Sequence, residues 1–118
     1  MPRSPLRLER RDQFLAVARA SRKLSRAGFA LQALARADGL PVRVGFTTTR
    51  KLGNAVVRNR TRRRLREAAR LVLAERPLSG FDLVLIGRPE TRRLPFARLR
   101  AEFAAALDRL EEPPRSRL

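Results

Sequence analysis

The sequence of 118 residues contains no cysteine and no histidine. Without cysteine there are no disulfides, zinc–cysteine sites or thiol chemistry, which fits a reducing compartment. Without histidine the chain lacks the side chain most often used in general acid–base catalysis, and its few carboxylates are too scattered to indicate a metal centre. We therefore expect no metal site and no self-sufficient catalytic site on this protein.

Long hydrophobic runs are absent too. The first 20 residues carry charge on both sides of an apolar stretch that is too short for a signal peptide. No other segment approaches the length of a transmembrane helix. The sequence thus predicts a cytoplasmic protein that has no membrane as its partner.

Acidic residues are scarce, with 11 Asp and Glu against 28 Lys and Arg and a formal net charge of +17. Such an excess favours a nucleic-acid partner first and a membrane surface second. All the basic residues except Lys23 and Lys51 are arginines. Arginine binds phosphate with two parallel hydrogen bonds and stacks on bases, but a bias towards GC-rich codons would produce the same excess, and both explanations stay open.

Hydrophobic periodicity and chain breakers predict one α+β domain. The expected elements are a helix over 9–20, a short edge strand around 24, strands over 29–34 and 42–48, a helix from about 55 to before 77, a strand over 81–87 and a helix from 95 to 110. The turn at 38–41 is expected to join its two strands as an antiparallel hairpin. The order α-β-β-β-α-β-α predicts a single-domain two-layer α/β sandwich, with helices on one side of a mixed sheet. Residues 1–8 are expected to form a flexible basic arm, 9–111 the domain and 112–118 a flexible tail.

The stretch from 50 to 70, RKLGNAVVRNRTRRRLREAAR, concentrates the charge. A turn at Gly53 and Asn54 precedes a helix in which about 100° of rotation per residue places one apolar stripe towards a core. That stripe consists of Val57, Thr61, Leu65, Ala68 and Val72. Most of the remaining circumference is cationic, and ion pairs with Glu67 and Glu75 account for only part of this charge. The helix is therefore predicted to bind a polyanion.

This stretch resembles the bacterial ribonuclease P protein subunit. The family pattern is two basic residues, a hydrophobic residue, Gly-Asn-Ala-Val, one further residue, Arg-Asn-Arg and a basic helix, and residues 50–60 and 62–67 match it in order. Residues 12–14 resemble the start of the family's first helix, and residues 81–89 resemble its last strand. The resemblance covers nearly the whole chain, and an ordered set of this length is far more specific than a lone triplet.

The resemblance implies a ribosomal-protein-like fold with an unusual left-handed β-α-β crossover, where the right-handed form is otherwise the rule. It also implies that the protein is the non-catalytic subunit of a ribonucleoprotein endoribonuclease. Together with a catalytic RNA, it would remove the 5′ leader of precursor tRNA, using Mg²⁺ that is held mainly by the RNA. No obligate protein partner is expected.

Two sets of site residues follow from the resemblance. Catalytic-RNA binding is expected at Arg50, Lys51, Asn54, Arg58, Asn59, Arg60, Arg62, Arg63 and Arg66. Leader binding is expected in a groove between the first helix and the sheet, at Phe14, Val17, Gln32, Phe46 and Thr48. The chain departs from the family in having Ala18 in place of a second aromatic on the helix and Gln32 in place of a tyrosine on the strand. Phe14, Val17 and Phe46 are equally consistent with core positions.

Two other functions remain open on the residues alone. A ribosomal or other basic RNA-binding protein would use the same arginine-rich helix. A protein-only nuclease would need carboxylates that converge on a metal ion, and the spacing of Asp12, Glu67, Asp82 and Glu90 does not require such convergence.

Overall fold

The computed structural model describes residues 6–20 and 22–112. In chain order, the elements are β1 (Leu6–Arg7), α1 (Arg11–Arg19), β2 (Arg22–Arg26), β3 (Phe29–Ala35), β4 (Arg43–Thr47), the 3-10 turn η1 (Arg50–Leu52), α2 (Ala55–Glu75), β5 (Phe81–Gly87), α3 (Pro89–Arg93) and α4 (Phe96–Glu111). The predicted α+β class is confirmed, and α4 ends at Glu111, one residue beyond the predicted end of that helix. The predicted tail from 113 onwards and residues 1–5 of the predicted arm lie outside the described residues. The short helix α3 was not predicted.

The strands form one mixed sheet in the order β1-β4-β5-β3-β2. Its centre is β5, which runs parallel to β4 and antiparallel to β3. The predicted hairpin between β3 and β4 is therefore wrong, because β5 lies between them. The most apolar strand, β5, takes the central position, where a strand pairs with it on each side. The turn at 38–41 is part of the longer connection between β3 and β4. The actual hairpin joins β2 and β3 through Gly28, whose φ of 94° suits glycine.

The N-terminal segment adds an edge strand. Leu6 and Arg7 pair in parallel with Arg43 and Val44 of β4. The amide of Leu8 donates a hydrogen bond of 3.1 Å to the carbonyl of Val44, and the Leu8 side chain is 5% exposed. For residues 6–8 the prediction of a flexible arm is therefore wrong, since a buried leucine and a backbone pairing hold them on the sheet.

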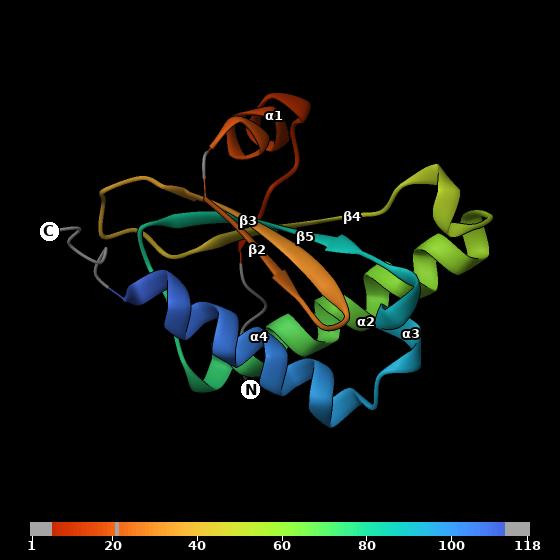
Figure 1. The fold of residues 1–118 in the computed structure, drawn as a ribbon. Helices are drawn as coiled ribbons and strands as arrows, with labels where there is room; N and C mark the ends of the chain where they lie inside the picture. The colour runs from red at the N-terminus through yellow and green to blue at the C-terminus, as the bar shows by residue number, and fades with distance from the viewer. Residues whose placement is uncertain (1–5, 21, 113–118) are drawn as a thin grey trace, which may run out of the picture.

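Helices cover both faces of the sheet (Figure 1). On one face, Leu83 and Leu85 of β5 join the large core beneath α2 and α4. On the other face, Val84 packs with Leu8 and Val17 beneath α1. The expectation that all helices lie on one side is thus wrong for α1. Helix α1 lies on the second face because β5 is apolar on both faces, so both faces must be covered.

Helix α2 begins and packs as its sequence predicts. The Asn54 side chain caps it by accepting a hydrogen bond of 3.0 Å from the amide of Val57. The predicted stripe faces the core, with Thr61, Leu65, Ala68 and Val72 buried and Val57 half-buried. The Thr61 hydroxyl donates to the carbonyl of Val57 at 2.8 Å, which satisfies this one polar group of the stripe.

The segment from β4 through α2 to β5 is a parallel β-α-β unit between adjacent strands. Because α2 packs over the sheet with its apolar stripe, its arginine-rich side is directed away from the core. The left-handed sense of this crossover, which the family resemblance implies, stays a prediction.

Candidate nucleic-acid interface

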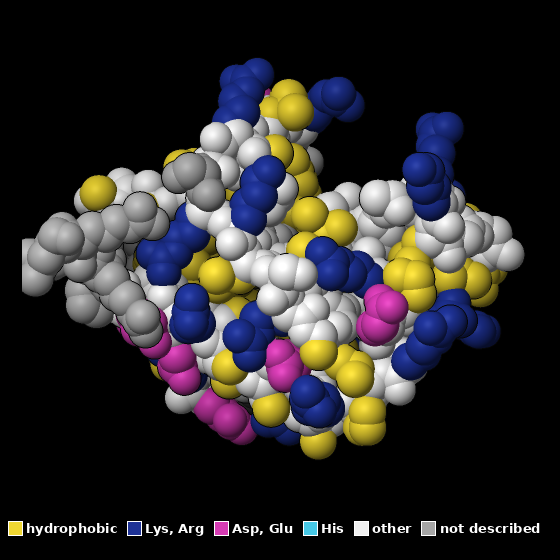
Figure 2. Space-filling model, viewed as in Figure 1, with side chains coloured by type: hydrophobic (Ala, Val, Ile, Leu, Met, Phe, Trp, Pro, Cys, Tyr) yellow, Lys and Arg dark blue, Asp and Glu magenta, His cyan; other side chains and the backbone are white. Residues whose placement is uncertain are grey.

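Basic side chains cover much of the surface (Figure 2). In that view most acidic side chains lie in the lower half, where α4 runs. Part of the acidic charge is neutralised locally by ion pairs, for example Glu102 of α4 with Arg26 and Arg98. Four arginines without acidic partners among the described residues, Arg60, Arg62, Arg63 and Arg66, lie on the outward face of α2.

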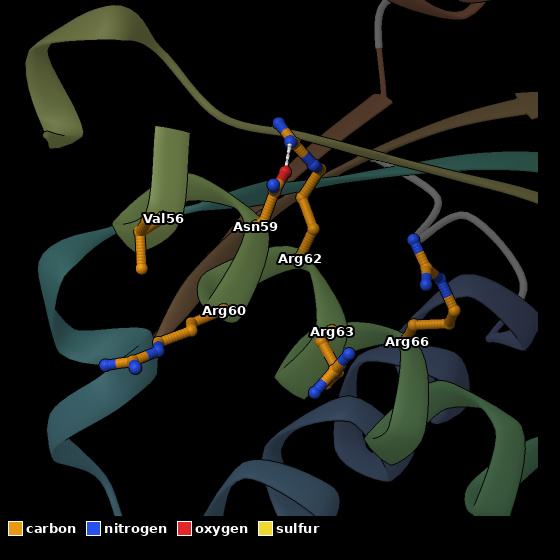
Figure 3. Close-up of a pocket in the computed structure, with 6 residues that line it drawn as sticks. All are labelled: Val56, Asn59, Arg60, Arg62, Arg63 and Arg66. Atoms are coloured by element: carbon orange, nitrogen blue, oxygen red, sulfur yellow. Dashed lines mark hydrogen bonds between the residues drawn. The ribbon is translucent and has the colours of Figure 1, made fainter. Parts of the chain in front are cut away.

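An open hollow of about 440 Å³ lies along that face (Figure 3). It is lined by Val56, Asn59, Arg60, Arg62, Arg63 and Arg66. Five of the nine residues predicted to bind the catalytic RNA are therefore brought together in one place. Four arginines around a single solvent-filled hollow create a strongly positive potential, which suits a phosphate backbone.

Contacts with β4 and the residue that follows it hold two of these arginines. One terminal nitrogen of Arg62, Nη1, donates to the Thr48 hydroxyl at 3.2 Å, and its Nη2 donates to Oδ1 of Asn59. The Arg66 guanidinium lies 6.0 Å from the centre of the Phe46 ring, in a cation–π contact. These side chains are thus partly ordered before any ligand arrives, which lowers the entropy that binding must offset.

The electrostatics of the hollow are unfavourable in the free protein. Burial lowers the pKa of Arg66, and the neighbouring charges of Arg7, Arg62 and Arg63 lower it further. The Nε atom of Arg66 is buried and has no hydrogen-bond partner among the described residues. A bound anion would relieve the repulsion between these like charges.

The other predicted RNA-binding residues lie outside the hollow. Arg50 and Lys51 are exposed on η1, just before the start of α2. The Oδ1 atom of Asn54 accepts the hydrogen bond that caps α2. Arg58, in the first turn of α2, is half-buried. Arg50, Lys51 and Arg58 extend the positive surface towards the N-terminus of α2, where the helix dipole also favours an anion.

Not every arginine of the run faces outward to solvent. Arg64 donates to the carbonyl of Thr91 at 2.8 Å and to that of Leu94, and its guanidinium lies 5.7 Å from the centre of the Phe96 ring. Arg64 thereby joins α2 to the connection between α3 and α4. Arg70 forms an ion pair with Glu67. Both guanidinium groups therefore bind other residues of this protein.

The five residues predicted to bind the leader do not line a single groove. Phe14 lies over Gly45 on the α1 face, and Gln32 of β3 pairs with Val84, whose side chain belongs to the cluster beneath α1. Phe46 and Thr48 lie on the opposite face, against Arg66 and Arg62. The alternation of β4 separates them, since neighbouring strand residues point to opposite faces.

Val17 of α1 is fully buried in the smaller core, as the alternative interpretation expected. Of the predicted leader set, Phe14 and Gln32 are therefore the residues that the α1 face brings together. Both are partly exposed.

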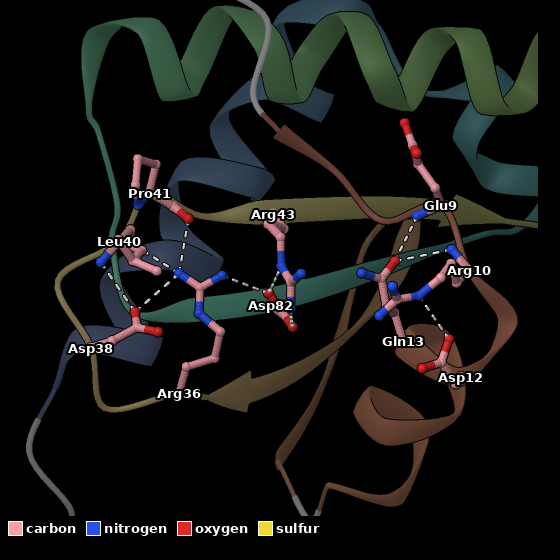
Figure 4. A network of polar contacts seen from close by, with 10 residues as sticks. All are labelled: Glu9, Arg10, Asp12, Gln13, Arg36, Asp38, Leu40, Pro41, Arg43 and Asp82. Carbon is pink, nitrogen blue, oxygen red and sulfur yellow. Dashed lines mark hydrogen bonds and ion pairs between the residues drawn. The ribbon is translucent and has the colours of Figure 1, made fainter.

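The carboxylates do not converge. Within residues 6–20 and 22–112, no group of three or more His, Cys, Asp or Glu is placed to hold a metal ion. Asp82 accepts 2.8 Å hydrogen bonds from Arg36 and Arg43 at one oxygen and a further bond of 2.6 Å from Arg43 at the other (Figure 4). Arg36 also donates to the carbonyls of Leu40 and Pro41, so this network ties the connection between β3 and β4 to β5.

A mixed sheet covered by a capped helix, with arginines on the outward face of that helix, defines a basic α+β protein whose charge suits a polyanion. Comparison with known proteins shows the family to which it belongs. The Ribonuclease P family model matches residues 1–111, and the chain belongs to this family.

The relatives agree over most of their length. The ribonuclease P protein component of Gluconacetobacter diazotrophicus is 57% identical over 101 residues, which cover 86% of this chain and 87% of the relative. That of Ruegeria pomeroyi is 48% identical over 109 residues, covering 90% and 86%. Among solved structures, the RNase P protein from Thermotoga maritima has a TM-score of 0.73 and 29% identity, covering 90% of this chain and 98% of that one. Among the described residues, none of the helices has both the length and the hydrophobicity that crossing a membrane requires.

Proposed function

We propose that this protein is the protein subunit of a ribonuclease P ribonucleoprotein, which removes the 5′ leader of precursor tRNA. The outward face of α2 binds the catalytic RNA, and the active site belongs to that RNA. The observation that carries the proposal is the hollow of about 440 Å³ in which Arg60, Arg62, Arg63 and Arg66 meet without an acidic partner among the described residues.

The chemistry of the hollow fits an RNA backbone. Arginine forks donate to phosphate oxygens, and the Asn59 amide is free to donate to a 2′-hydroxyl because its Oδ1 already accepts from Arg62. Val56, which is 56% exposed at the edge of the hollow, offers an apolar contact to a ribose or a base. The exposed Arg50 and Lys51 extend the contact along the same strand of RNA.

We further propose that the leader binds on the α1 face. Phe14 and Gln32 are partly exposed there and offer a ring for stacking and an amide for hydrogen bonding. Phe46 and Thr48 act on the opposite face instead, by positioning Arg66 and Arg62.

Within residues 6–20 and 22–112, no group of three or more carboxylates is placed to hold a magnesium ion. Both oxygens of Asp82 are bound by arginines, and both oxygens of Glu102 accept from Arg26 and Arg98. We therefore propose that the Mg²⁺ used in leader removal is held by the RNA. The lack of cysteine fits a reducing compartment, and we propose that the ribonucleoprotein acts in the cytoplasm.

Reconstitution tests this function. The purified protein is combined with the ribonuclease P RNA of the same genome, and cleavage of a precursor tRNA is measured at limiting Mg²⁺. We expect the protein to bind the RNA and to accelerate removal of the leader. If about 6 to 10 phosphates are neutralised, affinity falls by about 10³ to 10⁵ between about 50 and 200 mM salt.

A matched pair of variants separates the hollow from bulk charge. Arg60→Ala removes one charge from the hollow, and Arg109→Ala removes one from the exposed end of α4. Arg60→Ala should weaken RNA binding strongly, and Arg109→Ala should leave it nearly unchanged. Absence of RNA binding, or equal effects of the two variants, would overturn the proposed role of α2.

A further inference from the structure

The edge strand β1 brings one more arginine to α2. Arg7 pairs with Val44 in a parallel register, and paired residues in a sheet direct their side chains to the same face. Val44 is fully buried in the core beneath α2, so Arg7 emerges on the α2 side of the sheet. Its charge is close enough to Arg66 to lower the pKa of that guanidinium.

Two arginines of α2 lie on the side of the helix that faces β4. Arg62 and Arg66 lie one turn apart, and Figure 3 shows them on one side of the helix, with Arg60 directed to the other. Thr48 and Phe46, at the end of β4, contact these two side chains. Because β1 pairs with β4, all three arginines lie at the edge of the sheet formed by these two strands.

Nothing within the described residues neutralises this cluster. None of the ion pairs among them involves Arg7, Arg62 or Arg66, although Arg26, Arg36, Arg43, Arg70, Arg76, Arg98 and Arg100 all have acidic partners. The Nε of Arg66 is buried and has no hydrogen-bond partner in the part of the chain that the structure describes. A purely structural role would not gather three like charges, because their repulsion destabilises the free fold.

We propose that Arg7, Arg62 and Arg66 form a composite phosphate-binding site at the β1–β4 edge, which takes a backbone phosphate of the catalytic RNA. The site rests on the proposed function and extends the RNA interface from α2 to the N-terminal strand. Arg66 is stacked on Phe46 and Arg62 is hydrogen-bonded to Thr48, so two of the three forks are held in place before the RNA binds. Arg7 supplies the third charge from a different segment of the chain.

The test is a titration of the full-length protein against fluorescently labelled ribonuclease P RNA at several salt concentrations. We expect Arg7→Gln to weaken binding by about tenfold and to reduce the slope of log K against log salt by about 1. Arg109→Gln, which removes an equal charge from the end of α4, should change neither quantity.

A double-mutant cycle shows whether Arg7 and Arg66 hold one phosphate. If they do, combining Arg7→Gln with Arg66→Gln weakens binding little more than Arg66→Gln alone. Fully additive losses would overturn the composite site. Protection of the Leu8 amide from hydrogen exchange confirms that β1 still pairs in each variant, because that amide bonds to Val44.

Arg7→Glu distinguishes binding from a structural role. In the free protein it replaces repulsion of Arg66 with attraction, so the free energy of unfolding should rise or stay constant. RNA affinity should fall further than with Arg7→Gln. Loss of stability with unchanged RNA affinity would overturn the site.

Three further outcomes are separated by the design. If Arg60→Ala weakens RNA binding and Arg7→Gln does not, the composite site is wrong and the proposed function stands. If neither variant has an effect, the proposed role of α2 in RNA binding fails together with the composite site. If Arg7→Gln alters only the affinity of the assembled ribonucleoprotein for precursor tRNA, the assignment to the catalytic RNA is overturned in favour of the leader.

Discussion

The ring of Phe14 in α1 lies directly against the backbone of Gly45 in β4. A Cβ atom added at Gly45 would lie 2.5 Å from Cε1 of that ring and 3.3 Å from the Cβ of Leu8. The absence of a side chain at this one position is therefore what lets α1 approach the sheet and sets the height of Phe14 above it.

Gly45→Ala should displace the Phe14 ring. Because Gly45 is buried and Leu8 limits the space on the other side, we expect a loss of about 1 to 3 kcal/mol in the free energy of unfolding, measured by urea denaturation. Gly39→Ala is the control, since nothing lies within 4 Å of a Cβ there, and it should change stability by less than about 0.5 kcal/mol. Equal effects at the two glycines would mean that α1 is not held at this distance.

Arg63 and Arg64 are neighbours in sequence with different roles. Arg64→Ala removes hydrogen bonds to two backbone carbonyls and the contact with Phe96, so it should lower the free energy of unfolding by about 1 to 3 kcal/mol. Arg63→Ala should leave unfolding unchanged and weaken RNA binding. Thermal unfolding and RNA titration of both variants check this. A destabilised Arg63→Ala together with a stable Arg64→Ala would contradict the assignment.

Asp82 carries the charge that balances Arg36 and Arg43. Its side chain is 4% exposed, so Asp82→Asn leaves Arg43 without its ion-pair partner and Arg36 with Asp38 alone, in a partly dry environment. We expect a loss of up to about 3 kcal/mol, below the largest values for buried pairs because Arg43 is 34% exposed. Asp108→Asn, at an ion pair that is 67% exposed on the acidic side, should cost less than about 1 kcal/mol. Chemical denaturation distinguishes the two, and equal losses would show that the Asp82 network contributes no more than a surface pair.

Glu102 makes stability depend on pH. Burial alone would raise its pKa, but hydrogen bonds and charge interactions with Arg98 and Arg26 outweigh burial and lower the pKa below its ordinary value. A carboxylate with a lowered folded pKa contributes stability that is present above its unfolded value of about 4.3 and is lost as pH falls through the folded pKa.

The corresponding experiment compares wild type with Glu102→Gln in urea titrations from pH 7 to pH 3. The variant should be less stable at neutral pH, and the difference should shrink as the pH falls below about 4. A difference that stays constant over this range would exclude the charge of Glu102 as its cause.

The elements with strong local patterns were predictable from the sequence. The stripe that includes Leu65 and Ala68 identified the buried side of α2, and the apolar run from 81 to 87 identified β5. The choice of strand partners was not predictable, because the turn at 38–41 says only that the chain bends and not that β5 inserts between β3 and β4. Strand β1 was missed for a similar reason, since two residues have no periodicity.

The candidate site was also predictable from the sequence only in part. The charge and order of residues 50–67 indicated an RNA-binding helix, and helical geometry placed Asn59, Arg63 and Arg66 away from the core. That Arg64 bonds to the end of α3 depends on a segment 27 residues further along the chain. That Phe46 and Phe14 lie on opposite faces depends on which face α1 covers, and alternation within β4 alone leaves this undetermined.

One edge of the sheet is a strand that discourages further pairing. This edge strand, β2, carries Arg22, Lys23 and Arg26. Short edges and edge cations are the means by which natural sheets avoid adding strands from a second molecule. The hydrogen-bonding groups on the open side of β2 are thereby guarded against pairing with a second copy. We therefore expect the free protein to resist strand-to-strand association through this edge.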